Sequence, residues 1–141
     1  MRNKFVIVLA VFLVMGVVGI SGCTDSSSDN GTSDSSLKVS NLEVVSEGYG
    51  MYDVKATIVP DKDYDYLEMV LIWYDSSGAI IEKNSLVWNI NNVKSGQTLK
   101  VTGNGYITGD EVPAKVDVLI FDTVFSDGDE SNAIYKETVE L

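Results

Sequence analysis

Three features of the sequence predict an all-β fold for residues 37–141. Apolar and polar residues alternate with a period of two in most segments, which is typical of strands buried on one face. Clusters of Gly, Asn, Asp and Ser separate these segments at short intervals, as turns between antiparallel strands do. The third feature is an apolar run over residues 67–75, followed by a turn and a second run over residues 79–83, which predicts a central hairpin.

Residues 1–22 have the parts of a secretory signal peptide. Arg2 and Lys4 are positive, and the sixteen residues 5–20 are apolar or Gly, a run that is short for a membrane span. The segment ends in Ser-Gly-Cys23, which resembles the lipobox of prokaryotic lipoproteins, where a peptidase cleaves before the cysteine and its thiol carries diacylglycerol. The resemblance implies lipidation of Cys23 and a protein anchored at the extracytoplasmic face of the cell membrane. A plain transmembrane anchor is the alternative.

Residues 23–36 are predicted to be the lipidated cysteine and a tether. Thr24–Ser36 contains only Ser, Thr, Asp, Asn and Gly, so it has no apolar side chain whose burial could offset the entropy of ordering. A disordered linker of this length has a reach of about 20 Å. Asn30 begins an N-glycosylation sequon, although such a match also arises by chance in a segment rich in Ser and Thr.

Composition excludes several classes of function. The chain has no His, and Cys23 is its one cysteine, which excludes an intrachain disulfide, a cysteine metal site and a triad built on histidine. Without residues 1–22 the chain has eight Lys against twenty-one Asp and Glu, a net charge of −13. A nucleic acid is therefore not an expected partner, because its phosphates need a cationic surface. Anionic lipid headgroups would also repel the chain, so the lipid on Cys23 would provide the anchoring.

The first two predicted strands cover residues 37–46 and 52–58. In the first, the apolar pair Leu37 and Val39 is out of phase with the next pair, Leu42 and Val44, which predicts a bulge between them. A Gly-rich turn precedes the second strand, and Pro60 ends it. Residues 61–65 are predicted to be a polar loop.

The central strand over residues 67–75 is apolar on both faces, which predicts an interior position in a sheet. Asp75-Ser-Ser-Gly78 has the composition of a type I turn, and residues 79–83 return from it. Further strands are predicted at 85–90, at 99–101 until Gly103-Asn-Gly105 interrupts the strand, at 116–121 and at 133–141. About seven short strands with this spacing favour an antiparallel immunoglobulin-like β-sandwich, with Trp73 as its core tryptophan. A small closed barrel is the alternative.

The pentapeptide at residues 71–75 resembles the motif that names FxLYD domains, small sandwich domains of prokaryotic surface proteins and lipoproteins. Tyr74 and Asp75 match the motif, whereas Leu71 replaces its aromatic first position and Trp73 its leucine. The resemblance covers residues 52–121 approximately, implies a sandwich and brings no assigned activity. It gives structural roles, in packing or in the turn, to Leu71, Trp73, Tyr74, Asp75 and Gly78.

Two acidic segments could hold a cation if the fold brings them together. Residues 61–65 have carboxylates at the spacing that opens a calcium loop, but the later Gly and Glu of an EF-hand are missing. In an immunoglobulin-like sandwich, the loops after the second and sixth strands lie at the same end. A hard cation such as calcium would relieve the repulsion between them. The candidate ligands are Asp61, Asp63, Asp65, Asp122, Asp127, Asp129 and Glu130, and two ordinary solvated loops are the alternative.

Aromatic residues offer a second kind of site, for a sugar or a partner protein. The candidates are Tyr49, Tyr52, Tyr64, Tyr66, Trp88, Tyr106 and Tyr135, and half-buried fillers between strands are the alternative. Tyr64 and Tyr66 are expected to be the most exposed, because they lie in or next to the acidic loop. The sequence thus predicts a non-catalytic binding or structural module whose partner is an envelope protein, a wall polymer or a small solute. A calcium-binding module and a small hydrolase that uses paired carboxylates are the alternatives.

Overall fold

The computed structural model describes residues 37–141, so the predicted signal peptide, Cys23, the tether and Asn30 lie outside the described residues. The strands are β1 (Leu37–Gly48), β2 (Met51–Pro60), β3 (Tyr64–Tyr74), β4 (Ile80–Val93), β5 (Leu99–Tyr106), β6 (Lys115–Phe121) and β7 (Tyr135–Glu140), with a short 3-10 helix, η1 (Glu130–Asn132), before β7. No helix in this range is long and apolar enough to cross a membrane.

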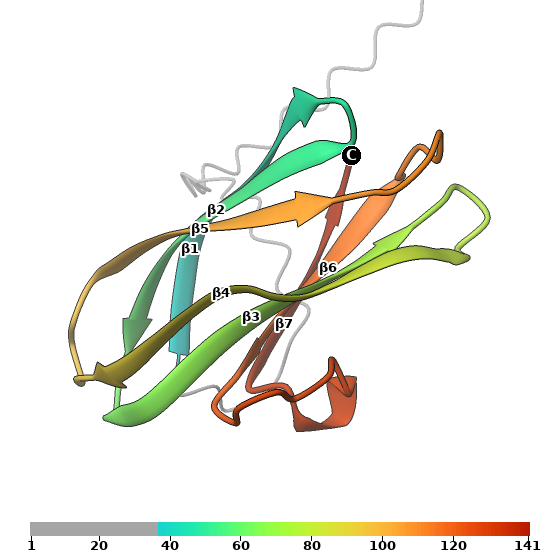
Figure 1. Cartoon of the computed structure of the whole chain (residues 1–141). Coiled ribbons are helices and arrows are strands. Elements are labelled where there is room, and N and C mark those ends of the chain that lie inside the picture. The colour runs from blue at the N-terminus through green and yellow to red at the C-terminus, as the bar shows by residue number, and fades with distance from the viewer. Residues whose placement is uncertain (1–36) are drawn as a thin grey trace, which may run out of the picture. The chain divides into compact units, whose positions relative to one another are not determined.

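The strands form two antiparallel sheets that lie face to face (Figure 1). The three-stranded sheet has the order β1-β2-β5, and the four-stranded sheet has the order β4-β3-β6-β7. The chain passes from one sheet to the other between β2 and β3, between β4 and β5, and between β5 and β6. This arrangement confirms the predicted immunoglobulin-like sandwich of seven strands and is not the closed barrel that was the alternative.

β3 is the interior strand that the sequence predicts, because β4 and β6 flank it and both of its faces are buried. Its inner face packs into the core between the sheets, where Trp73 is fully buried with its ring centroid 4.8 Å from that of Tyr52. The inner residues of β3 are Leu67, Met69, Leu71 and Trp73. On the outer face, a second apolar cluster consists of Val70, Ile72, Leu119 and Phe121.

The turn between β3 and β4 has the predicted geometry. The Gly78 amide donates to the Asp75 carbonyl oxygen at 3.1 Å, and the Asp75 carboxylate accepts from the amides of Ser77 and Ala79 at 2.8 and 2.9 Å. Gly78 has a φ of +84°, a left-handed conformation that a glycine adopts without steric cost. Asp75 therefore caps this turn and Gly78 permits it.

The predicted bulge in β1 is confirmed, since the register with β2 shifts between Ser40 and Glu43 and Asn41 has a φ of 53°. In β4 the expectation of two strands is wrong. Residues 80–93 form one strand, which absorbs two extra residues where Leu71 pairs with Asn84 and Met69 pairs with Trp88.

The predicted interruption of β5 at residues 103–105 is also wrong, because β5 continues through both glycines to Tyr106. A Cβ atom on Gly103 would lie 2.8 Å from the Val87 side chain, and one on Gly105 would lie 2.6 Å from the Trp73 ring. These glycines thus serve close packing between the two sheets instead of breaking the strand.

Asn84 of β4 closes part of the outer edge of β5. Its side-chain amide donates to the Tyr106 carbonyl oxygen at 2.8 Å, and its side-chain oxygen accepts from the Tyr106 amide at 2.9 Å. The same oxygen accepts from the indole nitrogen of Trp73 at 2.8 Å. One side chain thus replaces a pair of backbone hydrogen bonds and also satisfies the buried tryptophan.

Candidate functional site

The antiparallel pairing gives the sandwich two ends (Figure 1). We call them the Leu37 end, formed by residue 37 with connections 61–63, 94–98 and 122–134, and the Tyr49 end, formed by connections 49–50, 75–79 and 107–114 with residue 141. The register fixes this assignment, because Leu37 pairs with Pro60 and Gly48 with Met51 in one sheet. In the other sheet, Lys115 pairs with both Tyr74 and Glu140.

At the Leu37 end, the expected exposure of Tyr64 and Tyr66 is wrong. β3 begins at Tyr64, three residues earlier than predicted; Tyr64 packs into the core between the sheets, and Tyr66 is buried beside Glu68, while Asp65 is exposed. Only 5% of Tyr64 and 9% of Tyr66 is exposed. Neither ring is therefore available as a partner contact. The prediction failed because Tyr64 and Tyr66 have polar neighbours in the sequence and were assigned to a loop, whereas they are the first residues of a strand.

Asp63 of the first acidic loop has partners within the protein. Asp63 accepts from the Lys94 ammonium at 2.8 Å and from the Ser95 amide at 2.9 Å. The hydrogen bond from Lys94, with that from Ser95, holds the pKa of the Asp63 carboxyl below its ordinary value. Its role is to join the β2–β3 and β4–β5 connections.

The second acidic segment is used in the same way. Asp129 caps helix η1 by accepting from the Ser131 amide at 3.1 Å, and Glu130 pairs with Lys136. Lys83 donates to the carbonyl oxygen of Asp127.

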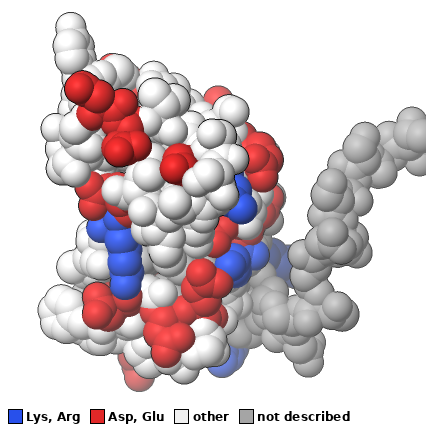
Figure 2. Space-filling view, turned by 90° about the vertical axis from the view of Figure 1, so that its right-hand side faces the viewer, with Lys and Arg blue, Asp and Glu red and all other residues white. Residues whose placement is uncertain are grey.

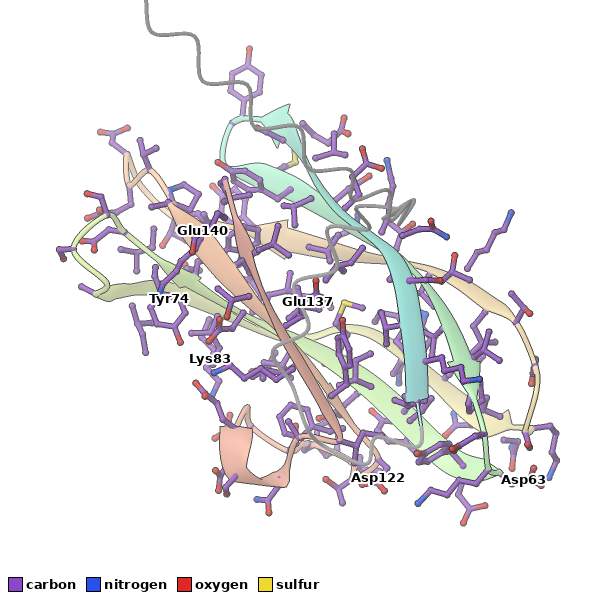
Figure 3. All side chains as sticks on the ribbon, turned by 180° about the vertical axis from the view of Figure 1, so that it is seen from behind. Asp63, Tyr74, Lys83, Asp122, Glu137 and Glu140 are labelled. Carbon is purple, nitrogen blue, oxygen red and sulfur yellow. The ribbon has the colours of Figure 1, made fainter. Side chains whose placement is uncertain are left out.

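The predicted cation site is not assembled. Within residues 37–141, no group of three or more acidic residues is placed to hold a metal ion. Asp63 and Asp122 lie at the same end but apart from each other (Figure 3). The two loops lie at the predicted end, but their carboxylates do not converge on one site.

Glu68 is a buried carboxylate that the sequence analysis missed, and it pins the β6–β7 connection to β3. The residue is 1% exposed, and it accepts from the Tyr66 hydroxyl at 2.7 Å and from the Phe125 and Ser126 amides at 3.1 and 2.8 Å. The Ser126 hydroxyl donates a further hydrogen bond. Burial alone would raise the pKa of Glu68, but these hydrogen bonds outweigh burial and hold its pKa below the ordinary value.

The pinned segment, residues 124–128, is here called the strap. It lies over the outer face of the four-stranded sheet, since a Cβ atom on Gly128 would be 3.1 Å from Val70. Phe125 and Asp127 in the strap have φ values of 54° and 55°, which are unusual for residues other than glycine. Glu68 therefore holds a strained segment in place over an apolar surface.

Asp117 is the second buried carboxylate, on β6. It accepts from the Tyr74 hydroxyl at 3.0 Å and the Thr138 hydroxyl at 2.5 Å, and Lys136 lies 3.0 Å away. Burial opposes ionisation, yet these partners lower the pKa of Asp117, while burial and the bond to Asp117 raise the pKa of Tyr74 to about 12. A signal for both buried acids exists in the sequence, because each lies on a strand whose two faces are otherwise apolar.

The Tyr49 end has a different surface, made largely of exposed apolar side chains. Six of the nine large hydrophobic residues exposed within residues 37–141 lie here: Tyr49, Met51, Ile80, Tyr106, Val112 and Leu141. Tyr49 is 95% exposed, at the tip of the β1–β2 turn. Met51 and Tyr106 pair directly across β2 and β5, and Tyr49 lies in the turn just before Met51; we call these three residues the apolar patch.

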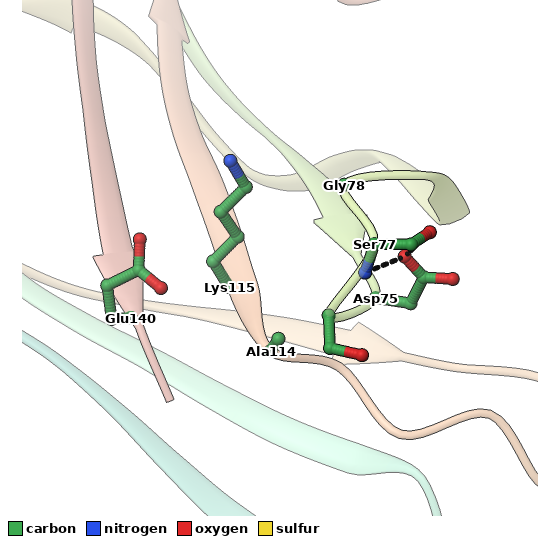
Figure 4. Close-up of a pocket in the computed structure, with 7 residues that line it drawn as sticks. Asp75, Ser77, Gly78, Ala114, Lys115 and Glu140 are labelled. Atoms are coloured by element: carbon green, nitrogen blue, oxygen red, sulfur yellow. Dashed lines mark hydrogen bonds between the residues drawn. The ribbon is translucent and has the colours of Figure 1, made fainter.

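A shallow hollow of about 300 Å³ lies at the same end, between the β3–β4 turn and the strands β6 and β7 (Figure 4). Its lining is polar, with Ser76, Lys115 and Glu140 around the turn that Asp75 caps. Lys115 lies with its ammonium 5.0 Å from the centre of the Tyr74 ring. The exposed apolar residues and this hollow together are the candidate binding site of the molecule.

Comparisons with known proteins add little to this description. No known family matches the chain, and no curated protein matches its sequence. Among solved structures, a GH3 β-glucosidase from Bifidobacterium adolescentis matches 74% of this chain with 14% identity and a TM-score of 0.43. β-Glucosidase 3B from Thermotoga neapolitana, solved with glucose, matches 79% with 12% identity and a TM-score of 0.38. The chain spans only 17% and 16% of these enzymes, and similarity at this level carries no functional information.

Proposed function

We propose that this protein is a lipid-anchored, non-catalytic binding module of the cell envelope that holds a partner protein with its Tyr49 end. The observation that carries the proposal is the gathering of exposed apolar side chains at one end of the sandwich. Exposed aromatic and Met side chains are the kind of surface that protein interfaces bury.

The position of residue 37 supports this orientation. The tether predicted from the sequence joins the domain at Leu37, so a lipid on Cys23 would hold the domain by that end. The apolar patch lies at the opposite end, where it would be presented away from the membrane.

The state of the buried carboxylates supports a non-catalytic role. A general acid in a glycosidase needs a raised pKa within a cleft. Glu68 and Asp117 instead have lowered pKa values, and neighbouring side chains and amides occupy their oxygens. Their hydrogen bonds stabilise the fold.

The anchor is tested in the native host. Cys23→Ser is expected to abolish incorporation of labelled fatty acid and to release the protein from the membrane fraction. A wild-type chain that takes up no label would contradict the lipid anchor.

The binding end is tested by photo-crosslinking in intact envelopes. A photoreactive phenylalanine analogue in place of Tyr49 is expected to give a discrete adduct that excess unmodified protein suppresses. The same analogue in place of Lys62, at the Leu37 end, should give none. Equal adducts from both positions, or none from position 49, would overturn the assignment of the Tyr49 end.

A further inference from the structure

We infer that the partner held at the Tyr49 end is a basic protein segment, whose Lys and Arg side chains lie against Tyr49 and Tyr106 between carboxylates. This inference rests on the proposed function and adds to it the chemistry of the partner. It is carried by the uneven distribution of charge between the two ends and by the rings exposed at one of them.

The lysines are concentrated away from the Tyr49 end. Residues 37–141 contain eight, and five of them lie in the Leu37-end connections or at the second residue of a strand that begins there: Lys38, Lys62, Lys94, Lys100 and Lys136. Lys55 and Lys83 lie within strands, each in an ion pair. Lys115 alone belongs to the Tyr49 end, and its ammonium lies over the Tyr74 ring.

The carboxylates are divided more evenly than the lysines, with seven at the Leu37 end and five at the Tyr49 end. Glu47, Asp110, Glu111 and Glu140 are exposed there. Among the described residues, no hydrogen bond or ion pair engages the side chains of Glu47, Asp110 and Glu111. Figure 2 shows one side of the molecule, on which carboxylates outnumber lysines. The apolar patch thus shares its end of the sandwich with unengaged carboxylates, and such an end is complementary to a partner that is both apolar and cationic.

The exposed tyrosines fit the same partner. An ammonium or guanidinium group over an aromatic face is attracted by the ring, and nearby carboxylates strengthen its binding. The protein already uses this contact twice, with Lys62 4.9 Å from the Tyr64 ring centre and Lys115 5.0 Å from that of Tyr74. Tyr49 and Tyr106, at 95% and 51% exposure, have rings free for an external cation. A neutral wall polymer could donate hydrogen bonds to these carboxylates, but only a cationic segment also gains their charge attraction.

A peptide titration followed by NMR tests the inference. The protein is the chain from residue 23 on, with Cys23→Ser. The probes are three twelve-residue peptides of equal aromatic content that carry four Arg, four Gln or four Glu. Only the Arg peptide is expected to bind, with amide shifts concentrated at residues 47–51 and 104–112, and its affinity should fall as salt increases. Shifts spread over the Leu37 end, or no binding of the Arg peptide, would overturn the inference.

Matched variants separate a specific site from general attraction to an acidic protein. Tyr49→Asn with Tyr106→Ser should weaken binding of the Arg peptide about fivefold or more. Asp110→Asn with Glu111→Gln should weaken it about threefold, whereas Asp61→Asn with Asp65→Asn, an equal charge change at the Leu37 end, should leave it unchanged. Equal losses from both charge pairs would overturn the inference.

The two proposals fail in different ways. Equal binding of the Gln and Arg peptides at the Tyr49 end would refute the basic partner and leave the binding end intact. Absence of the position 49 adduct in envelopes would refute the binding end itself, whatever the peptides do.

Discussion

The two ends of this sandwich use their side chains differently. At the Leu37 end, charged and polar groups bond to one another: Asp63 joins two connections, Asp129 caps helix η1, and Glu68 pins the strap. At the Tyr49 end, apolar side chains such as Tyr49 and Val112 face solvent. The difference teaches that acidic loops in such a protein can be structural, while most of the large exposed apolar side chains lie at the other end.

Removing Glu68 should cause the largest loss of stability, and it acts at the Leu37 end. Glu68→Ala leaves the amides of Phe125 and Ser126 without their acceptor and releases the strap from the outer face. We expect a loss of about 2–4 kcal/mol in the free energy of unfolding, measured by urea denaturation. Glu43→Ala, at an exposed position in β1, is the control and should change little. Equal unfolding midpoints for wild type and Glu68→Ala would show that the strap does not depend on this residue.

Acidification should lower the free energy of unfolding through the two buried carboxylates, Glu68 and Asp117. Glu68 and Asp117 have pKa values lowered by folding, so the unfolded chain binds protons at a pH where the folded chain does not. Their contribution to the free energy of unfolding is fully present above the ordinary pKa values of Glu and Asp, 4.5 and 3.8. It is lost as the pH falls below these values and through the lowered pKa values of the folded protein. Each unit of lowering is equivalent to about 1.4 kcal/mol.

Urea unfolding at a series of pH values from 7 to 3 measures this dependence. Glu68→Gln should flatten the curve, because one of the two buried acids no longer titrates. A variant whose curve keeps the full wild-type slope would assign the pH dependence to other carboxylates.

Calcium should have no specific effect, because within residues 37–141 no three acidic residues are placed together to hold a metal ion. The melting temperature in millimolar calcium should equal that in magnesium or sodium chloride at matched ionic strength, since any salt screens a very acidic protein. A calcium-specific rise that Asp63→Asn and Asp129→Asn both remove would restore the cation site.

Substitutions at the Tyr49 end should change stability least. Tyr49→Asn removes an exposed ring and retains a residue that tolerates a positive φ, so the free energy of unfolding should shift by about 0.5 kcal/mol or less. Ser126→Ala, at the opposite end, is the contrasting variant and should destabilise clearly because its hydroxyl donates to Glu68. If both variants destabilise equally, the two ends do not differ as described.

Local patterns were sufficient to predict the interior strand β3 and its turn. A strand buried on both faces is a continuous apolar run, and a tight turn needs particular residues, so both can be recognised within a few residues of sequence. They were insufficient where a residue's role depends on a distant one. Gly105 reads as a strand breaker until the Trp73 ring of the other sheet is placed beside it. From the sequence alone Glu68 is expected to face solvent, because the strap that covers it lies more than fifty residues later in the chain. The Tyr49 end likewise becomes recognisable as a surface only when three separate connections meet.

The hydrogen bonds of Asn84 have a consequence for molecules held close together on a membrane. An open strand edge can recruit the edge of another copy and so begin aggregation, and lipid anchoring would raise the local concentration at which copies meet. By bonding both backbone groups of Tyr106, Asn84 removes part of the edge on which β5 could accept a foreign strand. One amide side chain thus blocks part of the edge at which two copies could pair.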